Sequence, residues 1–121
     1  MYLPPQPTPK RCHEWGRALG EIVRARPERV VLIASGGMSH FPGTDRYASP
    51  EFDYDRGLLE ALRAGRGREL AAITAEELDK TGNIELRTWI TLLGAVGAAK
   101  ADVYCYEPSW HHGNAVVEWP L

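Results

Sequence analysis

Apolar side chains recur at helical spacing in the first part of the chain. Thr8 precedes Pro9, which is typical of a helix start, where threonine caps free N–H groups and proline occupies the first turn. Pro27 interrupts the pattern. These signals predict an amphipathic helix over residues 9–26. Its apolar face comprises Trp15, Leu19, Ile22 and Val23.

A continuous apolar run follows over residues 29–34 and leads to Gly36 and Gly37. Because its side chains do not alternate with polar ones, the run predicts a strand covered on both faces, as in a parallel sheet. A helix followed by such a strand indicates an α/β fold, a mostly parallel sheet flanked by helices. Residues 35–49 lack periodicity, so we expect a loop at the carboxyl edge of the sheet, where α/β proteins commonly bind ligands.

Start and stop signals farther along predict more helices and two strands. Ser49 and Pro50 begin one helix, which Gly65 ends. Thr74 and Glu77 match a capping box, in which each side chain bonds the backbone of the other residue. The remaining expected elements are a short helix over 68–73, a helix from 74 to 82, a longer helix capped by Asn83 and running into 94–97, and strands over 101–106 and 114–119.

Composition indicates a single folded domain over residues 1–121, with 44% apolar and 25% charged residues. A formal net charge of -2, spread along the chain, gives no basic surface for nucleic acid. Apolar stretches such as residues 30–34 are too short to cross a membrane, and the start lacks a signal-peptide pattern. We therefore expect a cytoplasmic protein. Cys12 and Cys105 are expected to be buried thiols, since their spacing suggests neither zinc nor a disulfide framework.

The segment SGGMSH at residues 35–40 is the sharpest chemical feature. Paired glycines let the backbone approach a ligand, and His40 at the mouth of a strand is suited to moving protons near neutral pH. A glycine turn with a solvent-facing histidine explains the same pattern equally well. A phosphate-binding loop is a third reading, but neither common phosphate-loop motif is present.

Two other features have ordinary explanations as well as chemical ones. Glu85 falls in the first turn of a predicted helix, where a carboxylate is favoured by the helix dipole alone. A metal-ligand role requires further ligands to converge on it. His111 and His112 are adjacent, and neighbouring residues of an extended segment point to opposite faces. They are therefore not expected to bind one metal, although one of them is expected to face a pocket.

Three segments taken together resemble the class III extradiol dioxygenases, and most of all the β-subunit of protocatechuate 4,5-dioxygenase. They are PQPTPKRC at 5–12, SGGMSH at 35–40 and NIELRTW at 83–89. The resemblance covers almost the whole chain. It implies an α/β domain that binds non-haem Fe(II) through two histidines and one glutamate and cleaves a catechol-type aromatic ring with dioxygen. His40 then corresponds to the acid/base histidine and Glu85 to the ligand glutamate.

The resemblance also implies where the substrate lies. Gly36 and Gly37 let the backbone approach it. The segment 108–114 corresponds to a family loop near the ring, so Trp110, His111 and His112 are expected to contact the substrate or its substituents.

The two histidine ligands of the family lie in its N-terminal half, so the chain resembles the C-terminal half of a larger α/β domain. The resemblance leaves three alternatives open: a truncated product, a split subunit completed by another chain, and a degenerate relative. We expect little iron binding by the chain alone, and either self-association or pairing with a complementary N-terminal segment or subunit. A non-catalytic module that has lost its iron is the alternative function, and an unrelated nucleotide-binding protein is a third.

Overall fold

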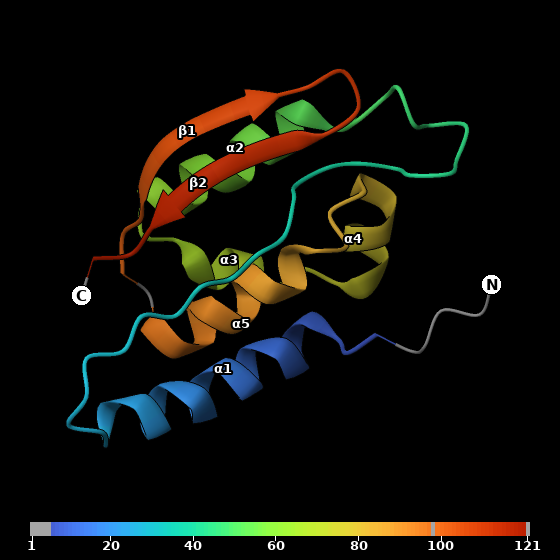
Figure 1. Cartoon of the computed structure of the whole chain (residues 1–121). Helices are drawn as coiled ribbons and strands as arrows, with labels where there is room; N and C mark the ends of the chain where they lie inside the picture. The colour runs from blue at the N-terminus through green and yellow to red at the C-terminus, as the bar shows by residue number, and fades with distance from the viewer. Residues whose placement is uncertain (1–5, 98, 121) are drawn as a thin grey trace.

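The structure is a computed structural model that describes residues 6–97 and 99–120. It contains five helices and one two-stranded antiparallel sheet. The β-hairpin lies against α2 on one side of the molecule, and α1 lies on the opposite side with α5 between them (Figure 1). The elements are α1 (Pro9–Arg24), α2 (Phe52–Arg63), α3 (Gly67–Ala71), α4 (Ala75–Thr81), α5 (Leu86–Val96), β1 (Asp102–Pro108) and β2 (Gly113–Glu118).

Local signals placed the helices well. The Thr8 hydroxyl accepts a hydrogen bond from the Arg11 N–H at 3.2 Å and caps α1. Thr74 caps α4 in the same way, bonded to the Glu77 N–H at 3.1 Å. The predicted capping box is only half formed in the described residues, because the Glu77 carboxylate accepts from the Tyr54 hydroxyl at 2.7 Å and not from the Thr74 N–H. The predicted 9–26 helix ends two residues earlier, at Arg24. No helix in the described part of the chain is long and apolar enough to cross a membrane.

The predicted mixture of helices and strands is confirmed, but the described residues do not form the predicted parallel sheet. Residues 29–34 are extended but form no ladder, and the sheet in the described residues is the antiparallel pair of β1 and β2. Val31 and Ile33 are 83% and 85% exposed, so this segment is not covered on both faces. A parallel strand needs a neighbour that runs the same way, and these residues provide none. The two closing strands are confirmed, with bounds shifted by one or two residues.

Asn83 was predicted to cap the last helix, and that prediction is also wrong. The N-cap position of α5 is Glu85. Asn83 is fully buried, and its amide donates hydrogen bonds to Asp55 at 3.1 Å and to the Thr81 carbonyl at 3.2 Å. A buried carboxylate therefore competes successfully for the side chain that local pattern assigns to the helix end.

Glycines let α1 and α5 touch through their backbones. A Cβ on Gly16 would lie 1.8 Å from the Thr91 carbonyl oxygen, and one on Gly94 would lie 2.2 Å from the His13 carbonyl oxygen. No larger residue fits at either position without moving a helix. The close contact fixes α5, whose N-cap residue is Glu85.

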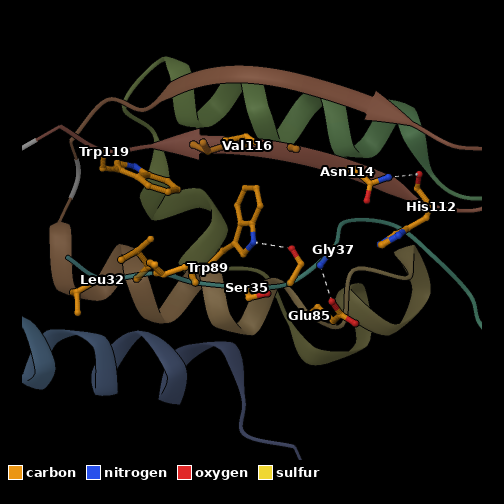
Figure 2. A pocket seen from close by; sticks show the side chains of 15 residues that line it. Leu32, Ser35, Gly37, Glu85, Trp89, His112, Asn114, Val116 and Trp119 are labelled. Atoms are coloured by element: carbon orange, nitrogen blue, oxygen red, sulfur yellow. Dashed lines mark hydrogen bonds between the residues drawn. The ribbon is translucent and has the colours of Figure 1, made fainter.

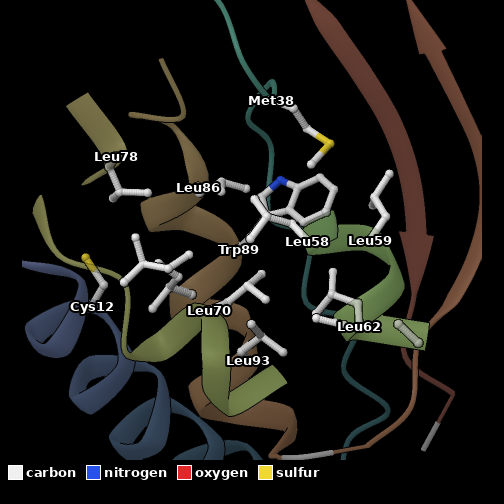
Figure 3. Packing of buried hydrophobic residues seen from close by; sticks show 14 of the residues in the cluster. Cys12, Met38, Leu58, Leu59, Leu62, Leu70, Leu78, Leu86, Trp89 and Leu93 are labelled. Carbon is white, nitrogen blue, oxygen red and sulfur yellow. The ribbon is translucent and has the colours of Figure 1, made fainter. Parts of the chain in front are cut away.

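The hydrophobic core lies between α5, α2, α3 and the hairpin (Figure 3). Met38 is fully buried within it, although it belongs to the loop that follows residues 29–34. Cys12 is buried, as expected, whereas Cys105 is only half-buried, and both thiols are free. Burial of Met38 anchors the loop that carries His40. The fully buried hydrophobic side chains are Met38, Leu62, Leu70, Leu78, Leu86, Ile90 and Leu93.

Candidate functional site

Three backbone contacts hold the loop over residues 35–40. The Met38 N–H donates to the Gly113 carbonyl at 3.0 Å, and the Gly113 N–H donates to the Ser39 carbonyl at 3.0 Å. The His40 N–H donates to the carbonyl of Gly82 at 3.1 Å. The loop is thus fastened both to the start of β2 and to the turn before α5, and the position of the His40 side chain is fixed by them.

Asp55 of α2 connects the elements around the His40 loop through hydrogen bonds. It is fully buried and accepts hydrogen bonds from the Ser39 N–H at 3.2 Å, the Asn83 amide at 3.1 Å and the Tyr106 hydroxyl at 3.0 Å. Burial raises the pKa of Asp55, and hydrogen bonds from Asn83, Tyr106 and Ser39 oppose that shift. One carboxylate therefore joins the loop, α2, the 82–85 turn and β1.

Sequence reasoning missed Asp55, although a signal was present. Asp55 occurs three, four and seven residues before Leu58, Leu59 and Leu62, the apolar face of α2. A charged residue on the buried stripe of a helix requires polar partners inside the protein.

His40 and Glu85 lie together, as predicted. The His40 Nε2 is 3.5 Å from a Glu85 carboxylate oxygen, and the exposed fractions of the two side chains are 18% and 48%. The other ring nitrogen, Nδ1, is 2.8 Å from the Met38 carbonyl. A carbonyl only accepts, so Nδ1 carries a proton in this bond, and Nε2 is the ring nitrogen that faces Glu85 and the opening.

Gly37 and His112 complete this group (Figure 2). The Gly37 N–H donates to the second oxygen of Glu85 at 2.6 Å. A Cβ on Gly37 would lie 1.9 Å from the His112 Nε2, so the close approach requires glycine. The rings of His112 and His40 are 4.5 Å apart. Burial lowers the pKa of His112, and the neighbouring His40 lowers it further.

Gly36 was predicted to let the backbone approach a ligand, and it approaches the protein itself. A Cβ there would lie 2.9 Å from the Glu85 carbonyl oxygen, and the Gly36 carbonyl accepts a hydrogen bond from the Trp89 indole at 3.1 Å. Gly36 therefore packs the loop against α5, and Gly37 packs it against His112.

Trp110 and His111 lie apart from this group, in an aromatic cluster with Tyr47. The ring centroids of Tyr47 are 5.2 Å from those of Trp110 and 5.0 Å from those of His111. Trp110 is 66% exposed. His111 and His112 point to different neighbours, as expected of adjacent residues, and their rings are 6.3 Å apart. Tyr47 had no distinguishing sequence signal and was not predicted.

A groove of about 540 Å³ runs from this group along the molecule, between residues 32–37 and β2. We call it the Trp89 groove after the residue that forms its floor. Trp119 lies at its far end and His112 at the near end, as Figure 2 shows. Its walls include Leu32, Ala34 and Val117.

These residues do not by themselves make an iron site. The described part of the chain contains no group of three or more His, Cys, Asp or Glu side chains placed to hold a metal. Glu85 has one oxygen bonded to Gly37 and the other facing His40. A non-haem iron site of the two-histidine, one-carboxylate type needs two histidine ligands in addition to a carboxylate such as that of Glu85.

Comparisons with known proteins identify the family. Residues 2–117 match the family model described as the catalytic LigB subunit of aromatic ring-opening dioxygenase. The chain is 23% identical, over 80% of its length, to a 2,3-dihydroxyphenylpropionate/2,3-dihydroxicinnamic acid 1,2-dioxygenase of Rhodococcus rhodochrous. It is 26% identical, over 88% of its length, to a 2-aminophenol 1,6-dioxygenase beta subunit of a Pseudomonas species.

The chain spans less than half the length of these relatives, 45% of the first and 40% of the second. Because the family match nevertheless covers nearly the whole chain, this protein belongs to the LigB family of aromatic ring-opening dioxygenases.

Proposed function

We propose that this chain supplies the acid/base histidine and one metal-binding carboxylate to an extradiol dioxygenase that cleaves catechol-type aromatic rings. The observation that carries the proposal is the pairing of His40 with Glu85, in which a carbonyl bond fixes the tautomer of the histidine. Family membership supports the reaction class. The finer resemblance to the protocatechuate 4,5-dioxygenase β-subunit, and a cytoplasmic location, belong to the same proposal.

His40 is suited to moving the proton of a catechol hydroxyl. Its Nε2 lone pair takes the proton, while the Nδ1–H remains bonded to the Met38 carbonyl. The resulting imidazolium lies 3.5 Å from the Glu85 carboxylate, which stabilises the positive charge. The same nitrogen then returns the proton as the ring opens. General acid and base catalysis by one positioned histidine typically contributes about 10²–10⁴-fold to the rate.

Iron belongs to the proposal as part of a completed site. Glu85 is the ligand that this chain contributes, and the two histidines come from a complementary N-terminal segment or subunit. The Pseudomonas relative is named as a beta subunit, which supports assembly from more than one chain. Dioxygen and the aromatic ring are the substrates. We place Gly36, Gly37 and His112 beside the ring.

Trp110 and His111 are proposed to contact substituents of the ring. Their cluster with Tyr47 is next to the His40 group, since the ring centroids of His111 and His112 are 6.3 Å apart. An exposed aromatic cluster offers stacking surface to an aromatic ligand.

A second function follows from the incomplete ligand set: a non-catalytic module that retains the family fold. Metal content and oxygen uptake with catechols distinguish the two functions, measured for the chain alone and with the product of an adjacent reading frame. We expect the chain alone to bind Fe(II) weakly and to take up no oxygen, and the pair to bind iron and cleave the ring. A pair that folds together but remains free of iron and inactive would support the non-catalytic module.

A further inference from the structure

One wall of the Trp89 groove is an extended segment whose backbone is free. Within the described residues, the N–H and C=O groups of residues 29–35 form no hydrogen bond with protein. Side chains along this segment alternate, with Val31 and Ile33 exposed and Leu32 and Ala34 half-buried. This is the period of a β-strand, so the segment has the conformation of a strand without a ladder.

The opposite wall is the outer edge of β2. Both backbone groups of Gly113 point away from β1, because they bond to Met38 and Ser39. Backbone groups of an antiparallel strand point alternately to its two neighbours. The N–H and C=O groups of Ala115 and Val117 therefore point into the groove as well. All of residues 113–118 are in register with β1. By the same alternation, the backbone groups that point to β1 are those of Asn114 and Val116.

The two walls meet at one end and separate towards the other. Within the described residues, the backbone bonds between them are those at Gly113, and none joins residues 29–37 to Ala115 or Val117. Half-buried apolar side chains, including Leu32, Leu92 and Val117, line the space between the walls. Two unpaired strand edges around an apolar floor resemble a sheet from which a strand is missing.

Unpaired polar atoms occur at both ends of the groove. The Trp119 Nε1 and the His112 Nε2 are buried and have no hydrogen-bond partner in the described part of the chain. Trp119 is only 9% exposed. Buried polar atoms normally find partners, so a donor and a ring nitrogen left over along one groove indicate that something with polar groups fills it.

We propose that the Trp89 groove receives an extended, apolar polypeptide segment that adds to the sheet as a β-strand. Its backbone bonds to residues 29–35 on one side and to Ala115 and Val117 on the other, and its carbonyl groups accept from the Trp119 indole. Its side chains cover Leu32 and Val117. This inference is independent of the proposed chemistry, although the near end of the groove opens beside Glu85.

The segment comes from outside these 121 residues. A second copy would have to insert its own residues 29–34 into the groove. In that copy the same residues form one wall of the groove, so the groove of the second copy would remain open. The chain spans less than half the length of the relatives named above, so more than half of a relative's length has no counterpart here. The missing strand is assigned to that part, whether it belongs to a longer chain or to a partner subunit.

Nuclear magnetic resonance of the ¹⁵N-labelled chain tests the proposal directly. The probe is a soluble ten-residue peptide in which valine and threonine alternate between terminal lysines. We expect its addition to shift the Trp119 indole N–H resonance and to slow hydrogen exchange at the Ala115 and Val117 amides by about tenfold or more. The Trp89 indole, already bonded to Gly36, serves as an internal reference.

Two variants give matched comparisons on β2. Ala115→Pro removes a groove-facing N–H without touching the β1 ladder, and we expect it to weaken peptide binding by about tenfold or more. Glu118→Gln, whose backbone faces β1 and whose side chain does not line the groove, is expected to leave binding within about twofold. If Ala115→Pro does not fold, Trp119→Phe takes its place, because it removes the unpaired indole N–H and keeps the ring.

Three results would overturn the proposal. The first is no change at Trp119 and the groove amides at millimolar peptide. The second is equal peptide binding by Ala115→Pro, or by Trp119→Phe where that variant replaces it. The third is tighter binding of a peptide with this chain's own residues 28–36, which would assign the groove to a second copy.

Discussion

Replacement of Asp55 by alanine tests whether one buried carboxylate holds the candidate site together. The variant leaves the Ser39 N–H buried without an acceptor, at a cost of about 1–3 kcal/mol. Asn83 keeps its bond to the Thr81 carbonyl, and the half-buried Tyr106 hydroxyl turns towards water. The loss of each of their hydrogen bonds to Asp55 therefore costs about 1 kcal/mol or less in stability. Removal of a carboxylate whose pKa is raised by burial offsets part of this loss.

We therefore expect Asp55→Ala to lower the free energy of unfolding by about 2–4 kcal/mol. This is a large share of the roughly 5–15 kcal/mol typical of a domain. Urea unfolding followed by circular dichroism measures the change, and amide exchange at Ser39 reports whether the His40 loop has come loose.

Asp53→Ala is the matched control, because Asp53 occupies the same first turn of α2 and its side chain is 100% exposed. Both variants remove a carboxylate that favours the start of the helix, so this effect cancels. A loss of stability equal in the two variants would refute the reasoning, since it would show that the buried bonds of Asp55 contribute nothing.

Three other predictions concern the site and the assembly. Gly37→Ala should force the His112 ring aside and cost about 1–3 kcal/mol; His112→Ala in the same chain should restore most of the loss, as measured by urea unfolding. The lowered pKa of His112 means that the unfolded state takes up its proton first, so stability should decline as pH falls below about 6.5, and less so in His112→Gln. The chain alone should self-associate at micromolar concentration in sedimentation experiments, because Val31, Ile33 and Trp15 are exposed; a monomer that binds no hydrophobic dye would contradict this.

The helices were predictable because their ends are set by neighbouring residues. Thr8, Thr74 and Gly82 each act within one turn, and Gly82 adopts the left-handed φ of 70° that ends α4. The 29–34 strand was mispredicted for the opposite reason. A run of β-branched residues favours extended backbone, but a ladder depends on a partner distant in sequence, and these residues provide none.

The residues of the candidate site were also predictable only where the signal is local in the sequence. The motif around His40 was visible as a pattern, but its meeting with Glu85, 45 residues later, was expected from the family resemblance and not from local spacing. Asp55 and Tyr47 were missed, since their importance lies in contacts with residues far along the chain. Buried polar networks depend on the tertiary fold, which a single sequence does not display.

Replacement of His40 in the completed protein tests the central claim most directly. The measurement is oxygen uptake with catechol, together with iron content, for the chain paired with its complementary segment. We predict that His40→Gln lowers the rate by about 10²–10⁴-fold while iron content stays unchanged, whereas His13→Gln on α1 leaves both unchanged. A His40→Gln protein that cleaves the ring at the rate of the parent would contradict the account.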